Sequence, residues 1–401
     1  MTSALKQILI MSRAVLLGLP RRLAISAAMA FSVALAVCVL VGFLAMAAGF
    51  EAVLKNSGSA AVAVVLGGGT NQETGSDIPA DAVRAVQAMR ADIGVASDAT
   101  GRPVLSEELV QAVVLPSGTD NQLRTVSLRG MGPAGPDLRD GIRITEGRMF
   151  ATGARELAVG AQLAAEFPTL AVGSTVRLGA VDWKVVGHYA AGGSIFESEI
   201  WTSIDAVRAA YDRQGQIQTL RLRLKGSEGL AKLTAVLKSG FSVETLSAVT
   251  EADLYAGQSS QTSDMIRLFG WPIAILMAFG ATAGALNTMM SSVAERRREI
   301  ATVRALGFSR LSAFAATWIE AIALALLGTA VGIVASWVVF NGWQASTMGA
   351  NNTRMAFQLV VDGQVMRTVA LFGLAIGLVG GFLPAVSATR IPLIAALRAQ
   401  A

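Results

Sequence analysis

Residues 295–308 carry charged and apolar side chains at helical spacing, and they lie between two long apolar runs. Ile300 and Val303 are three residues apart, and Leu306 or Gly307 follows after three or four more, so these residues share one face of a helix. The charged residues of the segment occupy the other face. Such a helix docks by seating its apolar ridge in a groove on a soluble partner, while its charges fix the orientation. The candidate docking residues are Glu295, Arg296, Arg297, Arg298, Glu299, Ile300, Val303, Arg304, Ala305, Leu306 and Gly307.

Two polar residues lie near or inside apolar runs, where polar groups are costly. Glu320 stands about ten residues after Arg310, and we expect it to reach the membrane interface and pair there, with a part in coupling as the alternative. Asn287 lies near the end of the preceding run, and we expect it to hydrogen-bond between helices rather than contact a ligand. For residues 295–308, a loop that serves only as a positively charged membrane anchor would explain the arginines but not the amphipathic helical spacing.

The remaining reactive residues form no catalytic set. His188 is the single histidine, so a hydrolytic triad or a multi-histidine metal site has too few members. The phosphate-binding pattern G-x-x-x-x-G-K-[ST] does not occur, and the stretch 67–70 lacks its lysine. Cys38 is the single cysteine, which excludes an intrachain disulfide. We therefore expect neither an enzyme nor a cofactor or metal bound by this chain.

Four apolar stretches are long enough to cross a bilayer, which requires roughly 20 residues. The uncharged stretches are 23–50, 268–294, 321–340 and 368–389. The first exceeds the apolar core of a cleavable signal peptide, about 7–15 residues, so we expect it to remain as a span.

The charge distribution predicts the orientation of these spans. Residues 51–266 contain 19 Lys and Arg against 24 Asp and Glu, a net charge of −5, while the remainder contains 14 against 4, a net charge of +10. Positive residues precede the first span, fill the segment between the second and third, and follow the fourth, so these parts are expected on the inner side. The positive excess thus belongs to membrane anchoring and indicates contact with lipids, not nucleic acid.

The expected fold is a membrane protein with four transmembrane α-helices, one before and three after a large α+β extracytoplasmic domain. The expected order is an interfacial helix at 1–22, a span at 23–50, an outer domain of two subdomains with a stalk at 51–266, a span at 267–294, a coupling helix at 295–310, a span at 311–340, an outer loop at 341–366, a span at 367–389 and an inner tail at 390–401.

Within the outer domain, leucines alternate with basic residues over 220–225, which predicts a half-buried strand with Arg221 and Arg223 on a wet face. Ser203 is expected to cap a short helix at 204–211. Residues 251–267 are polar, and we expect a helix that runs directly into the second span.

The chain resembles the MacB/FtsX-type (type VII) ABC transporter permeases, a group that includes lipoprotein-releasing and DevC-like permeases. The resemblance lies in the order of one span, a large outer domain and three spans, and in three sequence blocks. These blocks are Asn287 with 295–307, continuing to Glu320 and Gly328; Pro384 through Arg398; and the looser outer-domain stretches 146–160, 185–187 and 192–201.

The resemblance implies a permease subunit that transmits ATPase-driven motion to its periplasmic domain and exports or extracts a lipid, lipoprotein, peptide or drug. The alternative is an FtsX-like mechanotransmitter that regulates a periplasmic cell-wall hydrolase. It further implies a bacterial inner-membrane location with both termini cytoplasmic, a separate ATPase dimer that binds ATP and magnesium, pairing as a homodimer or with a related permease, and a possible periplasmic adaptor. MacB itself carries a fused ATPase, and this sequence departs from it in lacking the phosphate-binding pattern.

Overall fold

The structure is a computed structural model that describes residues 2–19, 23–55, 57–117, 122–226, 228–240, 246–348 and 354–392. It divides into a helical unit, residues 1–48, 264–343 and 359–401, and a sheet unit, residues 49–263 and 344–358. Arg21, Arg22 and most of the predicted inner tail, including Arg398, lie outside the described residues.

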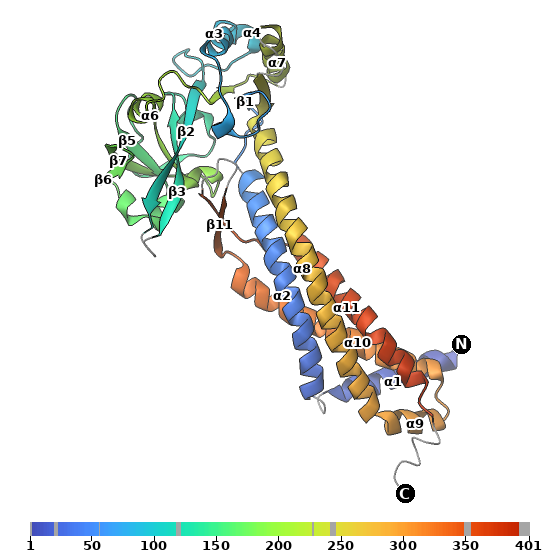
Figure 1. Ribbon diagram of the computed structural model, residues 1–401. Coiled ribbons are helices and arrows are strands. Elements are labelled where there is room, and N and C mark those ends of the chain that lie inside the picture. Colours follow the sequence, from blue (N-terminus) through green and yellow to red (C-terminus); the bar gives the residue numbers. More distant parts are fainter. Residues whose placement is uncertain are drawn as a thin grey trace. The chain divides into compact units, whose positions relative to one another are not determined.

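The helical unit contains four helices that are long and apolar enough to span a membrane, which confirms the predicted arrangement of one span before the large domain and three after it (Figure 1). They are α2 (Leu23–Lys55), α8 (Glu251–Glu295), α10 (Arg310–Phe340) and α11 (Gly363–Thr389). Their apolar residues pack on one another through a common core that includes Val37, Ala281 and Val369. Large apolar side chains such as Phe31 and Leu276 face outward, as lipid contact requires.

Close contacts between the spanning helices depend on glycine at two positions. A Cβ atom at Gly328 would lie 2.3 Å from the backbone oxygen of Ala30, and one at Gly373 would lie 1.8 Å from Oγ1 of Thr329. A Cβ at Gly280, in contrast, would meet no atom within 4 Å. Gly328 and Gly373 therefore allow the helices of one chain to approach, whereas Gly280 does not.

Two short helices lie at one end of this bundle. The α1 helix (Thr2–Leu17) and α9 (Arg297–Ala305) share an apolar cluster with the C-terminal end of α11. In this cluster Met11 and Val15 of α1 pack with Ile300 of α9 and Ala388 of α11. The N-terminal helix, the predicted coupling segment and the last turn of the fourth span thus meet at the same end.

The sheet unit is built on a ten-stranded mixed sheet with the order β10-β1-β9-β2-β3-β8-β5-β7-β4, and β6 pairs with β7. Its strands are β1 (Val62–Gly67), β2 (Leu105–Pro116), β3 (Leu123–Met131), β4 (Arg143–Gly147), β5 (Glu156–Gly160), β6 (Thr175–Leu178), β7 (Val181–Ala190), β8 (Glu199–Ser203), β9 (Thr219–Arg223) and β10 (Leu246–Thr250). The pairs β3–β8 and β5–β7 are parallel, and the other pairs are antiparallel.

Two separate apolar cores lie along this sheet. One core joins β2, β3, β5, β7 and β8 to α5 (Ala161–Glu166) and α6 (Ile204–Ala210). The other joins β1 and β9 to α3 (Ala80–Ala88), α4 (Arg90–Ile93) and α7 (Gly229–Gly240). Four single-turn 3-10 helices connect these elements: η2 (Glu73–Gly75), η3 (Pro136–Leu138), η4 (Pro168–Leu170) and η5 (Ile195–Ser198).

The segment between α10 and α11 contains a hairpin that belongs to the sheet unit. Strands β11 (Gln344–Met348) and β12 (Arg354–Gln358) pair antiparallel. The backbone N–H of Ala356 donates to Oγ of Ser198 at 3.2 Å, and Phe357 meets Phe50 edge to face with ring centroids 5.8 Å apart.

Two details of the sheet unit differ from the sequence predictions, and a third agrees with them. Arg221 is fully buried, so the predicted wet face of β9 is wrong at this residue, whereas Arg223 is half-buried. Ser203 stands at the N-cap of α6 without a capping bond from its side chain, and its hydroxyl instead accepts the N–H of Gly153 at 2.9 Å. The predicted polar helix is continuous with the second span, because α8 begins at Glu251.

Candidate coupling surface

The α9 helix is short because its sequence stops it at both ends. Arg296 precedes it with non-helical backbone angles, and Gly307 follows it at φ +100°, a left-handed conformation that favours glycine. The next helix, α10, is capped by Ser309, whose hydroxyl accepts the N–H of Ser312 at 3.1 Å. The segment therefore forms a separate helix between two spans (Figure 1).

The apolar ridge predicted to dock on a partner lies largely against the chain's own helices. Ile300 is 3% exposed and packs with Val293, Ala313 and Ala316, and Val303 covers the edge of the same cluster. Ile300 is therefore not available to a partner in this structure, whereas Val303 is only partly covered. Spacing showed that these residues share a face but could not show what that face meets.

Two of the predicted docking charges also bind within the helical unit. Nη1 of Arg296 lies 2.7 Å from Oε2 of Glu320, and both side chains are nearly buried. Nη1 of Arg304 donates to the carbonyl oxygens of Thr389 at 3.2 Å and Ile391 at 3.0 Å, so it caps the end of α11. Glu320 thus pairs as expected, and its partner is an arginine of the charged segment.

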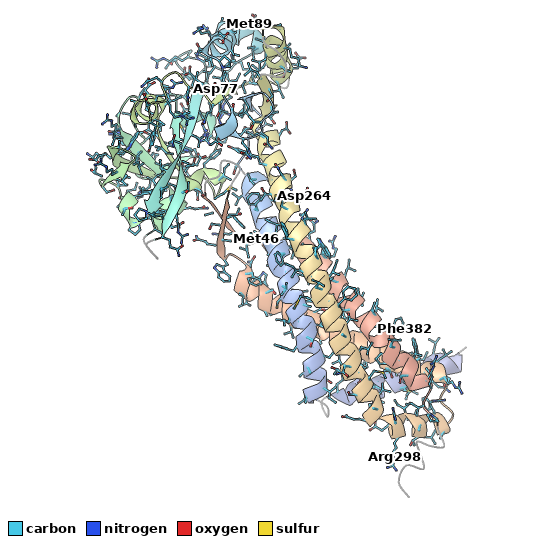
Figure 2. All side chains as sticks on the ribbon, in the orientation of Figure 1. Met46, Asp77, Met89, Asp264, Arg298 and Phe382 are labelled. Carbon is cyan, nitrogen blue, oxygen red and sulfur yellow. The ribbon has the colours of Figure 1, made fainter. Side chains whose placement is uncertain are left out.

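The outward side of α9 carries the other predicted residues. Leu306 is 77% exposed, an unusual exposure for a leucine at a helix end. The residues that share this exposed side are Glu295, Arg297, Arg298, Glu299, Thr302, Ala305 and Gly307. Figure 2 labels Arg298 at this end of the helical unit. This exposed side of α9, called here the α9 surface, combines one apolar anchor with basic groups and suits docking on a protein with a complementary groove.

Asn287 lies on the exposed side of α8. An exposed amide within an apolar span is costly in lipid, so this position favours contact with another helix. Gly280, two turns earlier, is exposed as well.

Sequence reasoning missed a group of buried charges in the sheet unit. It contains Arg129, Arg139 and Arg221, which come from separate parts of the chain. The alternating pattern around Arg221 predicted a strand, but the neighbouring sequence did not indicate that its side chain would face carboxylates.

Two family models match the chain. The MacB-like periplasmic core domain matches residues 26–252, more than half of the chain, and the FtsX-like permease C-terminal domain matches residues 271–393. The first model covers most of α2 and the sheet-unit segment up to the start of α8. The second model covers most of α8 and all of α9, α10 and α11.

Three individual proteins that match the chain are 24% to 31% identical to it over the matched segments. An uncharacterized ABC transporter permease of Methanocaldococcus jannaschii is 25% identical over 57% of this chain and 58% of its own length. The macrolide export ATP-binding/permease protein MacB of Bordetella avium is 24% identical over 66% of this chain and 42% of its own length. The uncharacterized ABC transporter permease YknZ of Bacillus subtilis is 31% identical over 36% of this chain and 34% of its own length. The chain thus spans about half the length, or less, of these curated relatives.

One solved structure matches about half of the chain at low identity. The crystal structure of the periplasmic region of MacB from Actinobacillus actinomycetemcomitans covers 53% of this chain and 95% of that structure, with 15% identity and a TM-score of 0.38. With a MacB-like core domain over more than half of its length and an FtsX-like C-terminal domain after it, the protein belongs to the MacB/FtsX-type family of ABC transporter permeases.

Proposed function

We propose that the chain is the permease subunit of an ABC exporter and that a separate ATPase subunit docks on the α9 surface. The exposure of Leu306, on the same exposed side as Arg297 and Arg298, supports this proposal, because the neighbouring Ile300 and Arg304 already bind within the helical unit. An exposed leucine on a surface that also carries arginine and glutamate side chains supplies an apolar anchor and a charge pattern for one orientation. ATP and magnesium would be bound by the ATPase subunit and not by this chain.

Motion would pass from this surface to the sheet unit through continuous helices. The α8 helix runs from Glu251 in the sheet unit to Glu295, two residues before α9. The α2 helix likewise includes residues of both units. Displacement of α9 would be passed along α8 and α2 toward the sheet unit. The substrate would be a lipid, lipoprotein, peptide or drug that is handled at the outer face of the membrane.

We place the protein in the bacterial inner membrane with both termini cytoplasmic and the sheet unit periplasmic. The excess of Lys and Arg at the ends of the spans that meet α1 and α9 supports this orientation. Exposed Asn287 and Gly280 on α8 support pairing with a second copy or a related permease, because a second helix would satisfy the amide. A periplasmic adaptor would bind the sheet unit.

The docking proposal predicts that Arg297→Glu combined with Leu306→Asp removes the ATP hydrolysis that copurifies with the tagged chain. The chain should still insert and keep its thermal unfolding midpoint, because both side chains are exposed. Lys6→Glu is the matched control for charge reversal, since Lys6 is exposed on α1 at the same end of the bundle. Full copurifying ATP hydrolysis in the double variant would refute docking at this surface.

A regulator of a periplasmic cell-wall hydrolase is the second candidate, favoured by the FtsX-like C-terminal match. It would use the same α9 surface and α8 connection but pull on a partner enzyme. Specific binding of a purified cell-wall hydrolase to the sheet unit, with ATP-dependent activation of that enzyme, would support this candidate over export.

A further inference from the structure

Seven charged side chains lie buried together inside the sheet unit, and the docking proposal uses none of them. They are four carboxylates and three guanidinium groups, none more than 6% exposed: Glu73, Glu108, Glu199, Glu251, Arg129, Arg139 and Arg221. We call them the buried charge cluster. They join η2, β2, β3, β8 and β9 to the first residue of α8.

Arg129 and Arg139 hold one side of the cluster together. Arg129 binds Glu199 through Nε and Nη2 at 2.8 and 2.7 Å, Glu73 through Nη2 at 2.7 Å and Glu108 through Nη1 at 3.0 Å. Arg139 binds Glu108 through Nη2 at 2.6 Å. These contacts are charge-assisted and partly bidentate, which makes them strong and directional.

Arg221 links this group to α8. Its guanidinium contacts Glu73 and Glu251 and lies 3.2 Å from Oε2 of Glu108. One turn along α8, the hydroxyl of Tyr255 accepts a bond from Nη2 of Arg221 at 3.2 Å. The other oxygen of Glu251 accepts the N–H of Ser59 at 3.2 Å. The first turn of α8 is thus held to the sheet through Glu251 and Tyr255.

Counted over the described part of the chain, the seven members comprise four carboxylates and three guanidinium groups, an excess of one negative charge among them. Buried charge without a partner is costly, and uptake of one proton would remove the excess. Glu108 contacts all three arginines, Glu73 contacts two, and Glu199 binds Arg129 with both oxygens and also accepts from Trp201. Among the cluster arginines, Glu251 contacts Arg221 alone.

The surroundings of Glu251, Glu108 and Glu73 also single out Glu251 as the group that takes up a proton. Burial raises the pKa of Glu251, and the attraction of Arg221 and Arg139 does not offset it. Burial also acts on Glu108, but Arg139 and Arg221 outweigh it and lower the pKa of Glu108 to about 2. Arg129 and Arg221 likewise hold the pKa of Glu73 well below its ordinary value. The groups that face Glu251 are Arg221 on β9, Arg139 after η3, Glu73 on η2, Glu108 on β2, Tyr255 on α8 and the amide of Ser59.

We propose that Glu251 is a proton-binding positioning residue: one proton from solvent adds to its carboxylate, neutralises the cluster and locks the first turn of α8 onto the sheet. With Glu251 ionised, the same turn undocks more readily, because undocking returns the excess charge to water. The consequence for transport rests on the proposed function, in which α8 transmits motion to the sheet unit. Protonation of Glu251 would strengthen the attachment of α8 to the sheet in that role.

The direction of the effect follows from linkage. An acid with a raised pKa in the docked state binds protons more tightly there than in the undocked state, so docking weakens as the pH rises through that window. The window opens near the ordinary glutamate pKa of about 4.3 and closes at the raised value. Within it, the undocking equilibrium changes about tenfold for each pH unit.

Hydrogen exchange of the purified full chain in detergent tests this proposal at pH values from 4.5 to 8, with rates corrected for intrinsic exchange. Amides at the start of α8 should lose protection about tenfold per pH unit within the window. Glu251→Gln should keep them protected at every pH, because it carries no charge. Asp253→Asn is the matched control: Asp253 is exposed in the same first turn and should leave the pH dependence unchanged.

Arg221→Gln provides a second test, because it removes the link and leaves Glu251 without a guanidinium partner. It should lower protection of the same amides at pH 8, whereas Arg223→Gln, two residues along β9 and paired with exposed Asp140, should not. The proposal is wrong if wild-type protection does not change with pH, or if Glu251→Gln is less protected than the wild type throughout. Because this experiment needs no ATPase, its outcome is separate from that of the docking test.

Discussion

Arg296 and Arg297 are adjacent in a run of three arginines, yet their side chains meet different surroundings. Arg296 contacts Glu320, which is 4% exposed, while Arg297 is exposed on α9. Arg296 stands at the break between α8 and α9 with non-helical backbone angles, whereas Arg297 is the first residue of α9, so the two side chains leave the backbone in different surroundings. The run therefore supplies both a structural ion pair and part of the α9 surface.

Arg296→Met should destabilise the helical unit, because the buried Glu320 loses the guanidinium group that lies 2.7 Å from it, and breaking a buried ion pair from one side costs about 3–5 kcal/mol. The double variant Arg296→Met with Glu320→Met should recover most of that loss, since neither charge then remains. Thermal unfolding of the purified chain in detergent measures both effects. A double variant as unstable as the single one would show that the pair does not act as a unit.

Glycine contacts decide how closely the spanning helices approach. Gly328 of α10 faces the backbone of Ala30 on α2, where an added methyl group would require the helices to separate. Without a strong hydrophobic force between helices in lipid, this packing is a principal source of their association. The helix elements thus depend on particular small residues and not on apolar content alone.

Gly328→Ala should lower the thermal unfolding midpoint by several degrees, the shift that overpacking of about 1–3 kcal/mol produces. Gly363→Ala is the matched control, because Gly363 begins α11 in the same unit and its added methyl group meets no atom within 4 Å. A midpoint for Gly328→Ala equal to that of the wild type would mean that α2 and α10 do not approach this closely.

The whole molecule joins two units whose stability rests on different forces. The helical unit has an apolar core with a few polar contacts. The sheet unit has two apolar cores and the buried charge cluster. Acid should therefore act mainly on the sheet unit, where ionised carboxylates are part of the interior.

Stability of the sheet unit should fall as the pH drops from about 4.3 toward 2. The pKa values of Glu73 and Glu108 are lowered in the folded state, so their stabilisation is complete above the unfolded-state value and is lost as they take up protons. Thermal unfolding followed by tryptophan fluorescence checks this, because Trp183 and Trp201 are buried in this unit. Glu228→Gln, on the surface, should not alter the profile; an acid-independent midpoint would contradict the role of Glu73 and Glu108.

At the scale of the whole chain, membrane labelling tests the topology. Single cysteines introduced by Arg297→Cys and Asp140→Cys, in a Cys38→Ala background, should react from opposite sides of the membrane with an impermeant maleimide. Both positions are exposed. Labelling from the same side would exclude transmission across the bilayer by this chain.

The sequence by itself determined the four spans, the large domain between the first two and the separate charged segment at 295–308. These depend on the length of apolar runs and on helical spacing, which are local properties of the chain. Only the tertiary structure decided that Ile300 packs inward and that Arg221 is buried. Burial depends on what lies opposite a residue, and for Arg221 that includes Glu73, which is 148 positions away in the sequence. No local pattern encodes such a pairing, so an alternating strand with arginines on one face has the same sequence signature whether that face meets water or carboxylates.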